Sequence, residues 1–233
     1  MNEHGFVAGL VFGCLMAYSV NIQASPVSAY QKISSEAIRV ACVGDSITYG
    51  EGIADREHNC YPAQLAVLLG PKYQVENFGV SGTTVLRNTR VAYVRQPEFL
   101  AALAFKPNRV VICLGTNDIK SHNWRYQEQF ISDYLALITA FQNLDAQPHI
   151  FLCYPTPTFP GRWDIDDAAI TQELIPKIVE VATQTHLAVI DLHTALGGKK
   201  VLFPDTVHPN AQGAGLIAEK IKRALQAEGL SSL

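Results

Sequence analysis

A serine, a histidine and an aspartate are the residues of this chain whose surroundings fit nucleophilic chemistry. Ser46 directly follows an apolar run in VACVGDSITYG (residues 40 to 50), and nothing near it in the sequence can take its proton. A serine hydroxyl is a poor nucleophile until a base removes that proton, and the base needs a third group that fixes its tautomer and stabilises its charged form. Any base for Ser46 must therefore come from a distant part of the chain.

His208, in FPDTVHPNAQG (residues 203 to 213), is the best candidate for that base. Asp205 precedes it by three residues, so one turn of loop can bring the carboxylate to one imidazole nitrogen while the other nitrogen points at Ser46. An isolated D-x-x-H pattern would be better explained by an acid in a surface loop and a histidine that caps a helix. The remaining loops decide between these interpretations.

Three groups in those loops can stabilise the negative charge that acyl transfer builds on a carbonyl oxygen. They are the backbone N–H of Ser46, the backbone N–H of Gly82 and the side-chain amide of Asn117. Taken singly, Gly82 is explained by a turn and Asn117 by a turn or a helix cap. Their positions just after successive predicted strands favour the functional interpretation. Glycine at position 82 would also let the backbone approach a substrate closely.

Short apolar runs rich in Val, Ile and Cys alternate with longer helical patterns and predict the elements that position these groups. The alternation indicates βαβ units, and we predict an α/β fold, a three-layer α/β/α sandwich with a five-stranded parallel sheet. The carboxyl ends of such strands meet at one ligand-binding edge, so the loops should converge there. The predicted strands are residues 38–43, 73–78, 109–114, 149–154 and 187–192.

Four helical patterns lie between or after these strands. One ends at Gly70, and in the third Pro176 either opens the main part of the helix or kinks it. The last helix is expected to begin after HPN, where Pro209 suits a first-turn position. Apolar residues that repeat at spacings of three and four predict the buried faces. These residues are Phe130, Tyr134, Leu137, Ile138 and Phe141, then Ile170, Leu174, Ile178, Val181 and Ala182, and finally Ile217, Ile221 and Leu225.

Residues 1–24 are predicted to be a secretory signal peptide, because residues 5–20 are an uninterrupted apolar and small-residue run. That run is shorter than the ~20 apolar residues of a spanning helix. An uncleaved anchor and a short membrane span are the alternatives, and Cys14 makes a lipoprotein a minor one. We therefore expect a linker at 25–36, one domain at 37–233, and export to the periplasm or the medium without stable membrane insertion.

Composition excludes several classes of function. The net charge of -3 comes without a basic stripe, so nucleic acid is not an expected partner. Cys42, Cys113 and Cys153 lie in apolar strands, and with no C-x-x-C pattern the cysteines are interpreted as structural. The G-x-S-x-G elbow is absent, because Thr48 and Thr83 occupy its last position, and P-loop, dinucleotide and zinc-protease motifs are absent too.

Four sequence blocks in order resemble the SGNH hydrolases, also called GDSL-type esterases and lipases. A single GDS is weak, but the four blocks together are specific. The resemblance runs from about residue 39 to the last helix, and it implies a flavodoxin-like SGNH hydrolase fold and hydrolysis of an ester through an acyl-enzyme, without cofactor or metal. The blocks are GDSI (44–47), NFGVSG (77–82), GTND (115–118) and DTVHPN (205–210).

The resemblance also implies a role for each site residue. Ser46 would be the nucleophile and one oxyanion donor, and Gly82 and Asn117 would be the other two donors. His208 would be the base and Asp205 the acid that orients it.

Two further positions in these blocks match the family pattern, and a third departs from it. Asp45 and Asp118 occupy positions that the family uses mainly to hold these loops in shape. Ile47 stands where leucine is usual, a change that the family commonly tolerates.

The phrases GDSITYGEGI, NFGVSGTT and LFPDTVHPNAQGA are similar to the branch that contains sialate O-acetylesterases and other carbohydrate acetylesterases. We therefore predict a serine esterase that removes small acyl groups, acetyl above all, from a small-molecule or glycan ester. Trp124, Arg162 and Trp163 are the predicted substrate contacts; the alternative is that each tryptophan packs its own loop against the domain. The oligomeric state stays open.

Two other functions are carried as alternatives. A lysophospholipase or thioesterase of the same family would act on longer acyl chains. A non-catalytic glycan-binding module on the same scaffold is disfavoured, because every chemical group of the site is present in the sequence.

Overall fold

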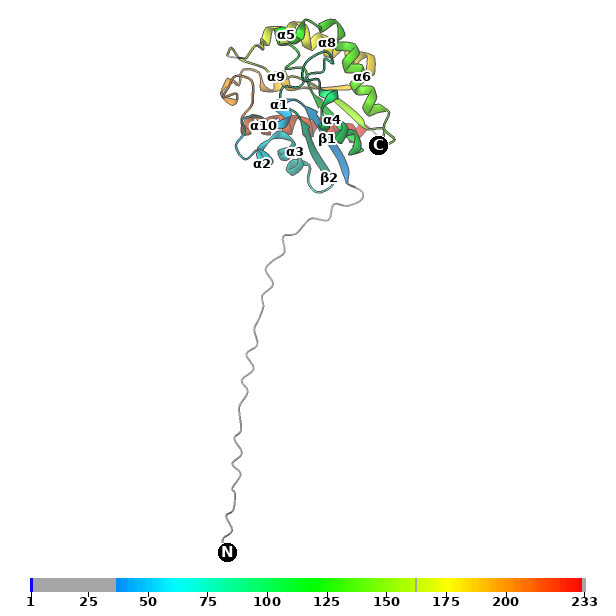
Figure 1. Cartoon of the computed structure of the whole chain (residues 1–233), viewed down its shortest axis with the longest axis vertical. Coiled ribbons are helices and arrows are strands. Elements are labelled where there is room, and N and C mark those ends of the chain that lie inside the picture. Colours follow the sequence, from blue (N-terminus) through cyan, green and yellow to red (C-terminus); the bar gives the residue numbers. More distant parts are fainter. Residues whose placement is uncertain (2–36, 162, 232–233) are drawn as a thin grey trace. The chain divides into compact units, whose positions relative to one another are not determined.

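Five parallel strands form one sheet in this computed structural model, which describes residues 1, 37–161 and 163–231 (Figure 1). The strand order is β2-β1-β3-β4-β5, a doubly wound order in which the ligand crevice lies between β1 and β3. The predicted sheet is confirmed, each strand end lying within one residue of its expected place. The strands are β1 (Ile38–Gly44), β2 (Tyr73–Gly79), β3 (Arg109–Cys113), β4 (His149–Tyr154) and β5 (Ala188–Asp191).

Helices cover both faces of this sheet, which confirms the three-layer prediction (Figure 1). Successive strand residues point to opposite faces. Val110 and Ile112 of β3 therefore join one core, beneath α4, α6 and α8, whereas Val111 joins the other, beneath α3, α9 and α10. The bounds are α3 (Tyr61–Leu69), α4 (Pro97–Ala104), α6 (Phe130–Gln142), α8 (Ile175–Thr185), α9 (Leu192–Leu196) and α10 (Ala211–Ser231).

Short helical turns complete the described part of the chain. They lie mostly in the connections that follow the strands, and the α4 helix and these turns are elements that the hydrophobic pattern did not predict. The turns are α1 (Ser46–Tyr49), α2 (Arg56–Asn59), α5 (Ser121–Trp124), α7 (Asp167–Ala169), and the 3-10 turns η1 (Tyr93–Arg95), η2 (Gln127–Gln129) and η4 (Lys200–Leu202).

The predicted apolar faces of α6, α8 and α10 are all buried in the two cores. Pro176 lies in the first turn of α8, as one of the two expectations had it, and a π-helical turn at Ile170–Leu174 leads directly into that turn. The last helix begins at Ala211, directly after HPN as expected. Pro209 lies two residues before this helix and not in its first turn, and Asn210 between them donates its backbone N–H to the carbonyl of Leu202.

Three strands end at the same level, and this alignment sets the position of the loops that follow them. Gly44 at the end of β1 pairs with Gly79 of β2 on one side and with Cys113 of β3 on the other. The helix α1 packs tightly over this point: a Cβ on Gly44 would lie 2.0 Å from Thr48 Oγ1. Glycine is therefore needed where β1 turns into α1.

The cysteines of the described region are free thiols. Cys42 and Cys153 are buried in the central strands, and burial raises the pKa of both thiols well above the ordinary value. Cys60 is also buried, beneath the start of α3, and Cys113 is half-buried. These settings keep Cys42 and Cys153 protonated and agree with a structural role.

The predicted signal peptide (1–24) and linker (25–36) lie outside the described residues, apart from Met1. The expected domain at 37–233 begins where the description resumes, one residue before β1. Across residues 37–161 and 163–231, no helix combines the length and the apolar character that crossing a membrane requires.

Candidate active site

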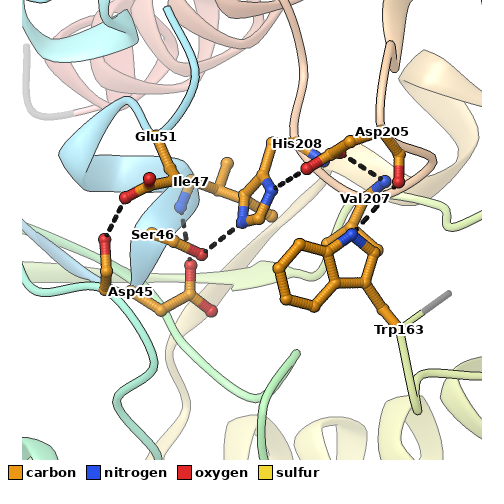
Figure 2. A network of polar contacts seen from close by, with 9 residues as sticks. Asp45, Ser46, Ile47, Glu51, Trp163, Asp205, Val207 and His208 are labelled. Atoms are coloured by element: carbon orange, nitrogen blue, oxygen red, sulfur yellow. Dashed lines mark hydrogen bonds and ion pairs between the residues drawn. The ribbon is translucent and has the colours of Figure 1, made fainter.

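Ser46, His208 and Asp205 form a continuous hydrogen-bonded chain, although 162 residues of sequence separate the serine from the histidine (Figure 2). The Nε2 atom of His208 lies 2.8 Å from Ser46 Oγ, and its Nδ1 atom lies 2.6 Å from Asp205 Oδ2. With Nδ1 donating to the carboxylate, Nε2 is left to accept the serine proton. The structure therefore brings together all three predicted residues in the order that a nucleophile, a base and an orienting acid require.

The loop before α10 holds the carboxylate of Asp205 in place. Its Oδ1 atom accepts the backbone N–H groups of Val207 and His208 at 3.1 and 2.7 Å, which leaves Oδ2 to face the imidazole. Partial burial raises the pKa of Asp205, but hydrogen bonds from the His208 ring and from these N–H groups outweigh it, so the net pKa lies below the ordinary value. Asp205 is thus ionised at neutral pH and can stabilise a charged imidazole.

Ser46 is the first residue of α1, and Asp45 caps that helix. The Oδ1 atom of Asp45 accepts the backbone N–H of Ile47 at 2.9 Å, while Oδ2 is buried without a hydrogen-bond partner among the described residues. Burial raises the pKa of Asp45 to about 6. Asp45 therefore shapes the turn that delivers Ser46 to the end of β1, as the family resemblance implied.

The predicted oxyanion donors, Ser46, Gly82 and Asn117, all line one cavity. Gly82 has a φ of 83°, a left-handed conformation that favours glycine. Within the described residues, the backbone N–H groups of Ser46 and Gly82 donate to no other group. Asn117 Nδ2 gives one hydrogen to the carbonyl of Thr83 at 3.1 Å, which fixes the amide and leaves its second hydrogen available.

Asp118 holds together the loops that follow β2 and β3. Its two carboxylate oxygens accept the backbone N–H groups of Val85 and Leu86 at 3.0 and 2.8 Å. The side chain is fully buried, and this burial raises its pKa to about 7. The bracing role that the resemblance implied for Asp118 agrees with these contacts.

The cavity has a volume of about 480 Å³, and the predicted residues of the loops after β1, β2, β3 and β4 meet in it. Trp163 lines it, as predicted for a substrate contact. Its ring also packs edge-on against His208, with centroids 5.5 Å apart, and its Nε1 donates to the backbone carbonyl of Asp205 at 3.1 Å (Figure 2). Trp163 therefore braces the base and the acid as well as facing the cavity.

Trp124 is not at the cavity, so its predicted role as a substrate contact is wrong. The side chain is only 7% exposed, packs against Phe130, and donates its Nε1 hydrogen to Glu173 at 2.6 Å. The alternative interpretation, in which the tryptophan packs its own loop, is the correct one. Arg162 lies outside the described residues.

Two charged residues of the cavity were missed by the sequence interpretation. Glu51 and Lys120 both line the cavity, and Glu51 accepts a hydrogen bond from Ser81 Oγ at 2.8 Å. Each lies close to a recognised block, five residues after Ser46 and three after Asn117, and this proximity was the available signal. Among the described residues, no group of three or more His, Cys, Asp or Glu side chains is placed to hold a metal ion.

Comparison with known proteins agrees with this arrangement. The GDSL-like lipase/acylhydrolase family model matches residues 42–216. An acetylxylan esterase of Xylanibacter ruminicola is 44% identical over 82% of this chain, but the match covers 44% of that protein. The chain thus spans less than half the length of this curated relative.

Solved structures show the same fold. An aryl esterase of M. smegmatis superposes with a TM-score of 0.67 at 19% identity, covering 82% of this chain and 99% of that one. Est24, a carbohydrate acetylesterase from Sinorhizobium meliloti, has a TM-score of 0.66 at 19% identity, covering 81% and 98% of the two chains. The family model, which matches most of the chain and spans the loops of Ser46 and His208, shows that the chain belongs to the GDSL-like lipase/acylhydrolase family.

Proposed function

We propose that this protein is a serine esterase that removes acetyl groups from carbohydrates. The observation that carries the proposal is the chain of hydrogen bonds from Ser46 through His208 to Asp205, at 2.8 and 2.6 Å, beside a cavity lined by the oxyanion donors. Such an arrangement can both activate a nucleophile and stabilise an oxyanion, the two requirements of acyl transfer.

The reaction proceeds through an acyl-enzyme. Ser46 Oγ attacks the ester carbonyl carbon as His208 Nε2 takes the hydroxyl proton, and the oxyanion accepts hydrogen bonds from the N–H groups of Ser46 and Gly82 and from Asn117 Nδ2. His208 then gives the proton to the alcohol oxygen as the ester bond breaks. Water attacks the acyl-enzyme by the same route, which releases the acid and returns the proton to Ser46.

A small acyl group and a sugar alcohol are the substrate parts that we propose. Support comes from the acetylxylan esterase, which is 44% identical over most of this chain, and from polar cavity residues such as Glu51, Thr116 and Lys120. A long acyl chain would displace the water that is hydrogen-bonded to these polar groups and would offer them no hydrogen bonds in return, which is unfavourable.

Acyl-chain length provides the test of this proposal. We expect 4-nitrophenyl acetate to be hydrolysed with a higher kcat/KM than 4-nitrophenyl octanoate, and acetylated xylan to release acetate. Faster turnover of the octanoyl ester would favour the lysophospholipase or thioesterase alternative. Binding of xylan without hydrolysis of any ester would favour the glycan-binding module.

We also propose that the protein is exported, because residues 5–20 form an uninterrupted apolar and small-residue run, after which Ile22 and Ala24 suit the positions before a signal-peptidase cut. In a bacterial host that expresses the full chain, the mature protein should begin close to residue 25 and occur in the periplasm or the medium. Mass spectrometry of the amino terminus measures this directly. An intact Met1 on cell-associated protein would contradict export.

A further inference from the structure

Two charged side chains, Glu51 and Lys120, line the cavity and have no part in the acyl-transfer steps. Glu51 lies just after α1, and Lys120 immediately precedes α5. They belong to the loops that follow β1 and β3, the strands on the two sides of the ligand crevice. Their place in the cavity raises the question of which part of the substrate they bind.

The ammonium of Lys120 stands over the ring of Trp163 but has no hydrogen-bonding partner in the described part of the chain. It makes no hydrogen bond or ion pair with any residue that the structure describes, and it lies 5.8 Å from the centroid of the Trp163 ring. Burial lowers the pKa of Lys120, although the carboxylates of Asp45 and Asp164 oppose this effect. A half-buried ammonium of this kind gains most from an oxygen atom that a ligand brings.

Glu51 offers the opposite capability. One of its carboxylate oxygens accepts a hydrogen bond from Ser81, the residue before the oxyanion glycine Gly82, and the other has no hydrogen-bond donor among the described residues. A carboxylate accepts hydrogen bonds and donates none. Glu51 can therefore take a hydroxyl hydrogen from a ligand while its first oxygen stays bound to Ser81.

The combination of charges favours a neutral ligand. A substrate with a carboxylate would be attracted by Lys120 but repelled by Glu51 and by the ionised Asp205, which line the same cavity. A cationic substrate would be repelled by Lys120. A hydroxyl is both a donor and an acceptor, so a neutral alcohol rich in hydroxyl groups satisfies Glu51 and Lys120 together.

We propose that Lys120 and Glu51 form a hydroxyl-binding subsite that holds the alcohol part of the ester, and that this alcohol is a neutral sugar. The ammonium donates to a hydroxyl or ring oxygen of the sugar, and the carboxylate accepts a hydroxyl hydrogen. Both residues act in positioning and specificity, since neither exchanges a proton or forms a bond in the reaction. This inference rests on the proposed esterase function of the same cavity.

The test compares two esters of equal ring size. A monoacetylated methyl xyloside carries free hydroxyls, whereas cyclohexyl acetate carries none. The quantity measured is the ratio of kcat/KM for the xyloside ester to kcat/KM for cyclohexyl acetate. In Lys120→Met and in Glu51→Gln we expect this ratio to fall about tenfold, mainly through KM, because each change removes a hydrogen bond to a charged group. Lys120→Arg should restore much of the ratio, because guanidinium is also a donor.

Matched controls exclude a general effect of charge. Lys72→Met and Glu57→Gln remove the same charges from exposed positions outside the cavity, and the ratio should stay as in the parent. A ratio that stays within about twofold in both cavity variants would overturn the proposal, since the expected loss is severalfold larger. A larger loss on an acetylated methyl glucuronoside than on the xyloside would also overturn it, because it would indicate selection of an anion.

Failure of the esterase assignment is distinguishable from failure of the subsite. If the parent hydrolyses none of the esters, the proposed function fails, and the subsite is then tested by calorimetric titration with methyl xyloside. Weaker binding to Lys120→Met than to Lys72→Met supports the subsite, and equal binding overturns it. If the parent hydrolyses both esters but every variant changes both rates equally, only the subsite fails.

Discussion

The base and the acid of this site are fixed by hydrogen bonds at the level of single atoms. Asp205 uses one oxygen for two backbone N–H groups and the other for the His208 ring. Trp163 adds a hydrogen bond to the carbonyl of Asp205 and a ring contact to His208. Each residue thus has an orientation set by neighbours that are not themselves reactive.

Asp205→Asn tests the orienting role. The amide oxygen can keep the two backbone hydrogen bonds, but the NH₂ group then faces His208 Nδ1 and favours the tautomer whose Nε2 carries the hydrogen. That nitrogen cannot accept the serine proton, so kcat should fall by about 10⁴, as in other serine hydrolases with this change. Steady-state kinetics measure the loss, with the melting temperature as the control. A kcat near the parent's would contradict the role of Asp205.

Asp45→Asn tests the cost of the buried carboxylate. The folded state holds the Asp45 proton up to about pH 6, against an ordinary value of 3.8. The contribution of Asp45 to stability is therefore greatest below the ordinary value and declines as the pH rises to about 6, a difference of about 3 kcal/mol. Asparagine can keep the cap to Ile47 and does not ionise.

Urea unfolding of both proteins measures this effect. The free energy of unfolding of Asp45→Asn, relative to the parent, should increase between about pH 4 and about pH 8. The charge of Asp45 also helps to raise the pKa of Asp118, so its removal relieves Asp118 at high pH and changes the difference in the same direction. A difference that does not change with pH would contradict the burial argument.

At the scale of elements, the junction of β1 and α1 determines where Ser46 lies. The helix packs so closely that a Cβ at position 44 would lie 2.0 Å from Thr48 Oγ1 and 2.7 Å from the carbonyl of Cys113. The second atom belongs to the neighbouring strand β3 and cannot move freely. A side chain at position 44 would therefore separate α1 from the sheet.

Gly44→Ala is expected to destabilise the fold by about 2 kcal/mol or more, because overpacking against backbone forces the elements apart. Gly197→Ala is a matched control: its added Cβ would meet no atom closer than 3.4 Å, and its φ of -52° is ordinary. Urea denaturation compares the two. Equal stabilities of the two variants would contradict the close packing of α1.

The strands and the long helices are the elements that sequence alone could predict. Unbroken apolar runs such as residues 149–154 mark buried parallel strands, and the repeat from Phe130 to Phe141 marks a buried helical face. Pro209 was expected in the first turn of α10 but lies before it, next to Asn210, which donates to Leu202 in a tertiary hydrogen bond that local pattern does not reveal. The short helix α4 has only two buried residues, too few for a clear period.

The site residues divide in the same way. The residues of the four blocks were predictable, because their types and their places after the strands are both unusual. The place of Trp124 was not predictable, since its partners Phe130 and Glu173 come from other elements. Glu51 and Lys120 lie outside the four sequence blocks, and only the folded structure shows that they line the cavity.

In the described molecule as a whole, a parallel sheet makes one site from five separate loops. The strand order places the ends of β1 and β3 side by side at the crevice, and the loop before α10 returns His208 to the same edge. The proposed nucleophile and its base are therefore neighbours only in the folded chain. The shared family model covers this whole assembly, from residue 42 to residue 216.

The central claim is that Ser46 is the nucleophile of an acetylesterase, and release of acetate from acetylated xylan by the parent and by Ser46→Ala tests it most directly. Ser46→Ala should fold with the parent's circular dichroism spectrum and lose at least about 10⁴-fold in kcat, the scale of loss when a nucleophile is removed. Equal rates of acetate release by the two proteins would contradict the claim.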